Sequence, residues 1–309
     1  MNFKKEKYIL LFLFLIVYLK NSQAQDLYFS QNLCTRTYLN PAIAGTDSTL
    51  DVSLAFARQF HLLGAPSITR FAADQYVRFL RGGIGVDLIG YKAGFERSTS
   101  INLNYAPHFE LFHHKLVLQP GFSIGYLELT GSTSFSAPNG GSGDPSIPWN
   151  GTLIRKFDFS TGIFMYTNKF YGGVALKHLT QPDVGFFGPS PLPYSLNVNV
   201  GANLSSNKVQ QPKFILSPNI IFRSQGDYQD LLLGITTKIR WFVLGLLYEN
   251  RDAFVFNAGL QFKYFKLGYS YDMTISQLTN VNYGTHELQL IGFIPYSRKP
   301  CKIKTIRFI

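Results

Sequence analysis

The stretch that decides the fold class reads Tyr194-Ser195-Leu196-Asn197-Val198-Asn199-Val200-Gly201-Ala202-Asn203-Leu204. Its leucine, valine and alanine residues occupy every second position, and serine, asparagine and glycine fill the positions between them. Side chains of a β-strand point alternately to opposite faces, so this stretch predicts a strand with one apolar and one polar face. The same alternation recurs at 98–105 and 254–263. We therefore expect an all-β chain.

Two soluble folds, a β-sandwich and a lipocalin-like barrel, would also produce this alternation. The predicted strands are roughly ten residues long or slightly longer, which is the length that a tilted strand needs to cross a bilayer. Charged residues make up 15% of the chain and aromatic residues 16%, whereas soluble domains carry roughly 25% charged residues. Tyrosine and phenylalanine recur at strand ends, as in the aromatic girdles of membrane barrels. These features favour a transmembrane antiparallel β-barrel.

Alternation and turn residues predict about fourteen strands, an even number as bacterial single-chain barrels require. The predicted strands lie near 49–58, 65–77, 81–92, 97–110, 114–128, 157–167, 169–179, 193–204, 212–224, 227–240, 241–250, 251–264, 265–274 and 284–296. The long connections, 129–156 and 180–192, are then the fifth and the seventh. Both face outside if the N-terminus is periplasmic, which is where barrels of this class carry their longer loops.

The N-terminus has the pattern of a secretory signal peptide. Lysines precede an apolar run from Tyr8 to Leu19, and Ser22-Gln23-Ala24 offers a cleavage site. The expected organisation is a signal peptide at 1–24 cleaved near Ala24/Gln25, a periplasmic N-terminal segment at 25–48, an outer-membrane β-barrel at 49–296 and a basic periplasmic C-terminal tail at 297–309. The tail is either a solvated end or a docking segment for an acidic partner or anionic surface. We expect the protein in the cell outer membrane.

The cysteines and histidines form no recognisable catalytic or metal-binding pattern. Cys34 and Cys301 lie near the two ends of the mature chain, either as a disulfide or as two free thiols. His113-His114 falls in a predicted turn without a carboxylate or cysteine cluster at ligand spacing. Motifs of hydrolases, zinc proteases, P-loops and dinucleotide sites do not occur, so we expect no cofactor, no metal and no enzymatic activity. The net charge of +11 would suit nucleic acid, but the export signal argues against that partner.

Motifs at the two ends of the mature chain go beyond composition. The N-terminal motifs are Gln25-Asp26-Leu27-Tyr28-Phe29-Ser30-Gln31 and Tyr38-Leu39-Asn40-Pro41-Ala42-Ile43-Ala44-Gly45. The C-terminal motifs are Gly268-Tyr269-Ser270-Tyr271-Asp272 and Gly284-Thr285-His286-Glu287-Leu288. Their order resembles the PorP/SprF family of the type IX secretion system, although Leu27, Cys34 and Phe60 depart from the residues usual in that family.

The resemblance implies an outer-membrane component of type IX secretion that binds or anchors exported cell-surface proteins of the gliding-adhesin type and contacts the periplasmic machinery. Its implied partners are the C-terminal domain of an exported surface protein, other type IX secretion components and outer-membrane lipid. A porin or a fatty-acid-type transport channel is the alternative function.

The residues expected to bind partners are Asn40, Pro41, Ala42, Ala44, Gly45, Gly284, His286 and Glu287. Proline restricts the residue before it to extended backbone, and Gly45 permits a turn before the first strand. The segment around Asn40 either plugs the lumen, binds a periplasmic partner or only tethers the terminus to the barrel. Glu287 is expected to face the lumen and to pair with an internal arginine or lysine.

Overall fold

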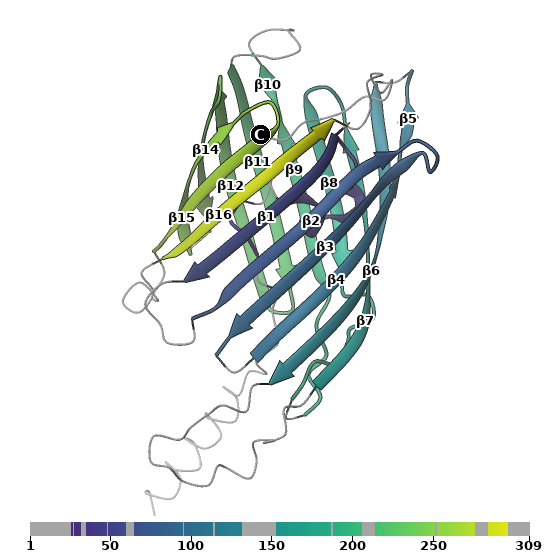
Figure 1. Ribbon diagram of the computed structural model, residues 1–309, viewed down its shortest axis with the longest axis vertical. Coiled ribbons are helices and arrows are strands. Elements are labelled where there is room, and N and C mark those ends of the chain that lie inside the picture. The colour runs from purple at the N-terminus through teal and green to yellow at the C-terminus, as the bar shows by residue number, and fades with distance from the viewer. Residues whose placement is uncertain are drawn as a thin grey trace, which may run out of the picture.

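The computed structural model describes residues 26, 28–31, 35–47, 49–59, 65–94, 96–113, 115–131, 153–186, 188–205, 214–250, 252–275 and 284–295. These residues form one antiparallel sheet of sixteen strands. Two of the strands, β5 and β10, are three and two residues long and extend the paths of their neighbours. The remaining fourteen strands form a closed barrel (Figure 1), which confirms the predicted fold and strand number.

The sixteen strands, apart from the short β5 and β10, correspond one to one with the predicted segments. They are β1 (Thr49–Gln59), β2 (Ser67–Val77), β3 (Gly82–Ala93), β4 (Glu96–Pro107), β5 (Phe109–Leu111), β6 (Leu116–Gly131), β7 (Leu153–Tyr166), β8 (Phe170–Lys177), β9 (Ser195–Ala202), β10 (Leu204–Ser205), β11 (Phe214–Gln225), β12 (Tyr228–Ile239), β13 (Phe242–Glu249), β14 (Ala253–Gln261), β15 (Phe265–Thr274) and β16 (Thr285–Pro295). β7 begins four residues earlier than predicted. Two short helices, α2 (Arg36–Leu39) and η1 (Pro41–Ile43), precede β1.

Pairing between the first and last strands closes the barrel. β1 and β16 are in register from Thr49 opposite Pro295 to Gln59 opposite Thr285. Each of the fourteen long strands therefore has a hydrogen-bonded neighbour on both sides over at least part of its length, and the described sheet closes on itself.

The barrel is apolar outside and polar inside, the reverse of a soluble barrel or sandwich. Leu54 and Phe56 of β1 are 49% and 42% exposed on the outer face. The alternating residues of the inner face include some of the most buried polar groups of the chain, among them Arg70, which is 2% exposed. In the stretch that predicted the fold, the polar residues Ser195, Asn197 and Asn199 are buried, which matches a polar lumen. This arrangement excludes the two soluble alternatives.

The two ends of the barrel differ in their connections. One end, the long-loop end, carries the connections 132–152 and 178–194. The other, the turn end, carries short turns such as 167–169, 240–241 and 262–264, together with the start of β1 and the end of β16. Aromatic side chains project at the turn end, including Phe79, Phe112 and Trp241. The prediction that the fifth and seventh connections are long and share one end is confirmed.

Among the described residues, no helix is long and apolar enough to cross a membrane. The predictions for the signal peptide, for Cys34 and Cys301, for His114 and for the tail at 297–309 fall outside the described residues.

Candidate functional site

The described residues before β1 lie inside the barrel. We call the described residues of 26–47 the plug segment. Leu39 joins an apolar cluster with Ile221, Leu232, Leu247 and Val255, which come from β11 to β14. The plug segment therefore contacts the wall formed by β11 to β14.

Two further clusters attach the plug segment to the rest of the wall. Ala42 and Ile43 pack with Val117, Phe164, Tyr166 and Tyr171 of β6, β7 and β8. Phe29 packs with Ala55, Ala57, Ile68 and Ile89 of β1, β2 and β3. Since these contacts lie on different sides of the lumen, the plug segment crosses it. The residues expected as a periplasmic segment at 25–48 are thus, where described, enclosed by the barrel.

The centre of the plug segment is the Asn40–Gly45 motif. Asn40 has extended backbone, with φ −152° and ψ 116°, and its side-chain oxygen accepts a hydrogen bond of 2.9 Å from the Ala42 amide. It thereby caps η1, which begins at Pro41, where the missing N–H costs no hydrogen bond. Gly45 has φ +65° and turns the chain toward β1. The backbone predictions for Asn40 and Gly45 are confirmed.

Glycines in the wall make room for this motif. A Cβ atom at Gly121 of β6 would collide with the backbone of Ala42, and one at Gly162 of β7 with the side chain of Asn40. A Cβ at Gly83 of β3 would meet the Ala44 carbonyl. The Asn40 amide also donates to the carbonyls of Ile163 and Val174, at 3.2 and 3.4 Å. The wall thus has a glycine surface that fits the motif at backbone distance.

Charged and polar groups of the wall bind the plug segment along its length. Glu287 of β16 accepts hydrogen bonds from the backbone amides of Ser30, at 2.6 Å, and Gln31, at 3.1 Å. Arg36 bonds Asp51 of β1 and lies 3.5 Å from Asp74 of β2. Burial lowers the pKa of Arg36, but the carboxylates of Asp74 and Asp51 outweigh this effect, so its pKa stays above the ordinary value. The guanidinium therefore remains charged.

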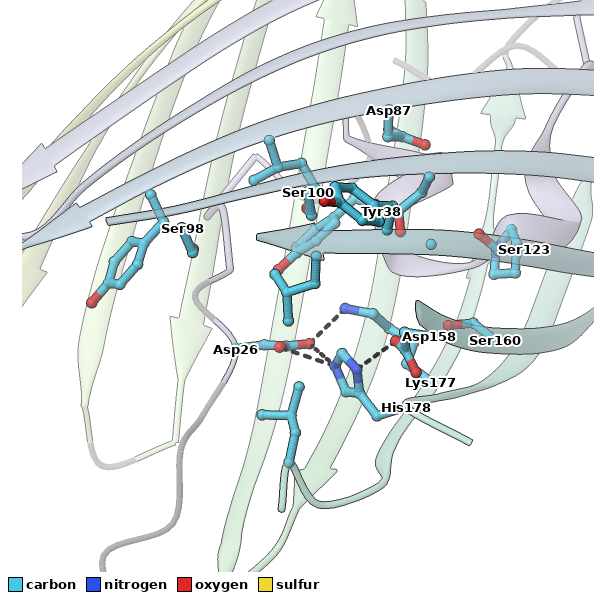
Figure 2. Close-up of a pocket in the computed structure, with 18 of the residues that line it drawn as sticks. Asp26, Tyr38, Asp87, Ser98, Ser100, Ser123, Asp158, Ser160, Lys177 and His178 are labelled. Carbon is cyan, nitrogen blue, oxygen red and sulfur yellow. Dashed lines mark hydrogen bonds and ion pairs between the residues drawn. The ribbon is translucent and has the colours of Figure 1, made fainter. Parts of the chain in front are cut away.

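The start of the plug segment is bound at the long-loop end by a group that we call the latch cluster: Asp26, Asp158, Lys177 and His178 (Figure 2). Lys177 Nζ lies 2.6 Å and His178 Nε2 2.9 Å from Asp26 Oδ2. His178 Nδ1 lies 2.7 Å from Asp158 Oδ2. Both ring nitrogens of the histidine thus face carboxylates, an arrangement that fits the charged imidazolium.

The electrostatics of the latch cluster follow from these contacts. Burial raises the pKa of Asp26, but the charges of His178 and Lys177 outweigh it and hold the pKa well below its ordinary value. Burial lowers the pKa of His178, but Asp26 and the hydrogen bond to Asp158 outweigh it and raise the pKa to about 9. At neutral pH both groups are charged and attract each other.

A cavity of about 170 Å³ lies beside the latch cluster, between the plug segment and the wall from β2 to β8. Its lining is rich in hydroxyl groups, from Ser98, Ser100, Ser123 and Ser160. Val184 and Leu192, from the connection after β8, border it as well. The described residues contain no group of three or more histidine, cysteine or acidic side chains placed to hold a metal ion. The polar groups of the latch cluster bind one part of the chain to another.

The structure separates the residues predicted to bind partners into four places. Asn40, Pro41, Ala42, Ala44 and Gly45 are buried at the centre of the plug segment. Glu287 faces the lumen as expected, but its described partners are the plug backbone and the Ser270 hydroxyl, not an arginine or lysine. Gly284 precedes β16 with φ +93°. His286 lies on the outer face, where its Nδ1 is 2.6 Å from the Tyr269 hydroxyl. Their partner-binding role stays a prediction.

The sequence alone does not point to the latch cluster. Asp26 belongs to the N-terminal motif, and Lys177-His178 marks the end of a predicted strand. The available sign of a site in the sequence was the adjacent pair of basic residues at the end of a strand, beside a long loop. Nothing local connects them with an aspartate 151 positions earlier.

Comparison with solved structures finds other barrels. The chain is similar to the CymD monoaromatic hydrocarbon channel (TM-score 0.48, 10% identity, 87% of this chain and 94% of that one) and to the KdgM porin (0.40, 6%, 78% and 98%). It is also similar to BamA from Haemophilus ducreyi lacking POTRA domains 1–3 (0.41, 6%, 80% and 70%). These likenesses are weak, and the fold assignment rests on the closed strand order.

Comparison with curated protein sequences gives no match. A family model described as type IX secretion system membrane protein PorP/SprF matches residues 21–291, which include the plug segment and nearly the whole barrel. The inside-out barrel and the motifs at its two ends agree with this match. The chain belongs to the PorP/SprF family of type IX secretion system membrane proteins.

Proposed function

We propose that this protein is a plugged outer-membrane scaffold of type IX secretion. It binds or anchors an exported cell-surface protein of the gliding-adhesin type through the C-terminal domain of that protein. The supporting observation is that the plug segment crosses the lumen and is held by apolar clusters on three sides. A porin or fatty-acid-type channel needs a path along the lumen, whereas a scaffold needs only the surfaces at its two ends.

The long-loop end is the proposed binding surface for the exported protein. In outer-membrane barrels the longer loops are extracellular and the shorter turns periplasmic. The connection after β8 folds over the barrel mouth, with Val184 and Leu192 buried and a bridge between Asp183 and Pro191. The other long connection joins the end of β6 to the start of β7, and both of these strand ends lie at the same end of the barrel.

The turn end is the proposed contact with the periplasmic machinery. β16 ends there at Pro295, and the proposal assigns the basic tail at 297–309 to the periplasmic side. The signal peptide at 1–24 and its cleavage near Ala24/Gln25 belong to the same proposal, because a barrel of this kind must be exported before it folds.

Purification of the tagged barrel from gently solubilised outer membranes tests this proposal. We expect a large exported surface protein and other type IX components to co-purify, as identified by mass spectrometry. A variant lacking 134–150 should lose the exported protein and keep the periplasmic components. A matched variant lacking 206–212, in the connection before β11 at the turn end, should keep the exported protein.

Two outcomes would contradict the scaffold proposal. Unchanged recovery of the exported protein with the 134–150 variant would remove the long-loop end as its binding surface. Recovery of the barrel alone, together with steady conductance of the wild-type protein in planar bilayers, would support the channel alternative.

A further inference from the structure

The outer face of the barrel carries a row of cations at the long-loop end. The register places Arg58 opposite Ser67, Ser67 opposite Lys92, and Lys92 opposite Arg97. These four residues lie on neighbouring strands, β1 to β4, each at the first or second position from the strand end. We call Arg58, Lys92 and Arg97 the basic row. Neighbouring strands are about 4.8 Å apart, so the three cations span on the order of 15 Å.

The side chains of the basic row point away from the lumen. Arg58 continues the outward positions of Leu54 and Phe56, and all three are exposed. Lys92 and Arg97 are exposed as well. Glu96, adjacent to Arg97 in sequence, lines the inner cavity and therefore lies on the other side of the wall. In Figure 1 the strands that carry the row form the front of the barrel.

No acidic group neutralises the basic row in the described part of the chain. The nearest outward carboxylate is that of Glu128 on β6, which lies one outward position closer to the barrel centre. It already bonds Arg155 Nε at 2.9 Å. Like charges on facing positions of neighbouring strands repel each other, and Lys92 and Arg97 are such a pair. An anion from outside the chain would relieve this repulsion.

The surroundings of the basic row are those of a membrane interface. Toward the barrel centre the outer face becomes apolar, with Phe56, Leu88 and Ile101 exposed on the same strands. Arginine and lysine stems can lie along such a surface while their charged ends reach the polar layer. On the flank, the Tyr269 hydroxyl contacts His286, the residue opposite Arg58 in the register. Tyrosine is enriched at this level of membrane proteins.

We propose that the basic row binds the phosphate headgroups of anionic lipids in the outer membrane. Cations clustered at the membrane surface attract anionic headgroups, and three cations within four neighbouring strands concentrate that attraction on one side of the barrel. The proposal concerns the lateral surface, and it holds whether or not the long-loop end binds an exported protein.

The test uses the full-length barrel in nanodiscs of phosphatidylcholine with a minority of phosphatidylglycerol. Native mass spectrometry of the released barrel measures how far phosphatidylglycerol is enriched over its share in the disc. We expect clear enrichment for the wild type and a several-fold loss in the variant R58Q/K92Q/R97Q. The matched control R78Q/K169Q/R240Q removes three cations from turns at the other end and should keep the enrichment.

Raised sodium chloride should weaken the enrichment, because exposed charges are screened by salt. Both variants change only exposed side chains, and a heat-dependent shift in gel mobility verifies that each remains a folded barrel. Equal enrichment in R58Q/K92Q/R97Q and in the wild type would overturn the proposal, and so would a wild type without enrichment. Complete displacement of phosphatidylglycerol by inorganic phosphate would assign the row to free phosphate instead.

Discussion

Lys177 Nζ lies 2.6 Å from Asp26 Oδ2, although 151 residues separate the two along the chain. Lys177 is the last residue of β8 and is fixed in the barrel wall. Asp26 is the first described residue of the plug segment. This ion pair therefore connects the start of the plug segment to the long-loop end, while β1 holds its other end at the turn end. Both ends of the plug are attached to the wall.

The latch cluster predicts a pH dependence of plug attachment. The pKa of His178 is about 9 when it faces Asp26, and about 6.5 when it is released. Because the pKa is higher in the attached state, protonation of His178 stabilises that state. This contribution, on the order of 3 kcal/mol, is complete below about pH 6.5 and is lost as the pH rises through about 9. The protection of residues 28–31 against hydrogen exchange, relative to the intrinsic exchange rate at each pH, should therefore fall between those pH values. In the Asp26→Asn variant, residues 28–31 should exchange faster at neutral pH, and their protection should depend less on pH.

Asp227→Asn provides the control for this prediction. Asp227 lies in the turn between β11 and β12, at the same end of the barrel, and takes no part in the latch cluster. This variant should keep the wild-type profile. An Asp26→Asn variant with unchanged exchange at neutral pH would show that the apolar clusters alone hold the plug.

The wall glycines predict which substitutions displace the plug. Gly121→Val puts a side chain where Ala42 now lies, so we expect the plug segment to leave its place while the barrel still forms. Conductance in planar bilayers should rise by an order of magnitude or more. Gly90→Val is the matched control, because a Cβ at Gly90 of β3 meets no atom within 4 Å. Equal conductance of the two variants would contradict the plug interpretation.

The barrel could be predicted because its signal is local. Alternating apolar and polar residues mark each strand, as in Ser195–Ala202. The pairing of successive strands then follows from their order in the chain. The early start of β7 at Leu153 shows the limit of this reasoning. Apolar and polar residues alternate only weakly at the start of β7, which follows a glycine-rich stretch of sequence. The strand begins this early because these residues pair with β6.

The plug could be predicted only in part. The local geometry of Asn40 and Gly45 followed from proline and glycine chemistry. Its position inside the lumen depends on Gly83, Gly121 and Gly162, which lie on three different strands and have no sequence relationship to the motif. From the sequence, plugging the lumen was one of three possible roles of this segment, beside binding a periplasmic partner and tethering the terminus. Only the fold brings the three glycines next to the motif. The latch cluster depends in the same way on contacts that the sequence does not mark.

Leu39→Ala is expected to loosen the plug at the wall formed by β11 to β14. Leu39 is 2% exposed and fills a space between Ile221, Leu232 and Val255. Truncating a buried leucine typically costs about 2–5 kcal/mol, through lost burial and the cavity left behind. Proteolysis of the plug segment in the folded barrel should accelerate accordingly. Leu244→Ala, on the lipid-facing side of β13, should leave the rate unchanged. Equal rates for the two variants would show that this cluster does not hold the plug.

The buried pair between Arg70 of β2 and Asp87 of β3 is predicted to be essential as a pair. Arg70 also donates to the hydroxyl of Thr37 in the plug segment, and Asn104 donates to Asp87 at 2.6 Å. Asp87→Asn leaves a buried guanidinium without its counter-charge, which costs about 3–5 kcal/mol. The double variant Arg70→Met/Asp87→Leu removes both charges and should be less destabilised than Asp87→Asn. Urea unfolding in lipid vesicles measures both, and Glu128→Gln, which breaks the exposed pair with Arg155, should leave the midpoint nearly unchanged. The single variants Arg70→Met and Asp87→Leu complete the comparison. If the destabilisation of the double variant equals the sum of their two destabilisations, Arg70 and Asp87 stabilise the barrel independently, and the lumen does not depend on their pairing.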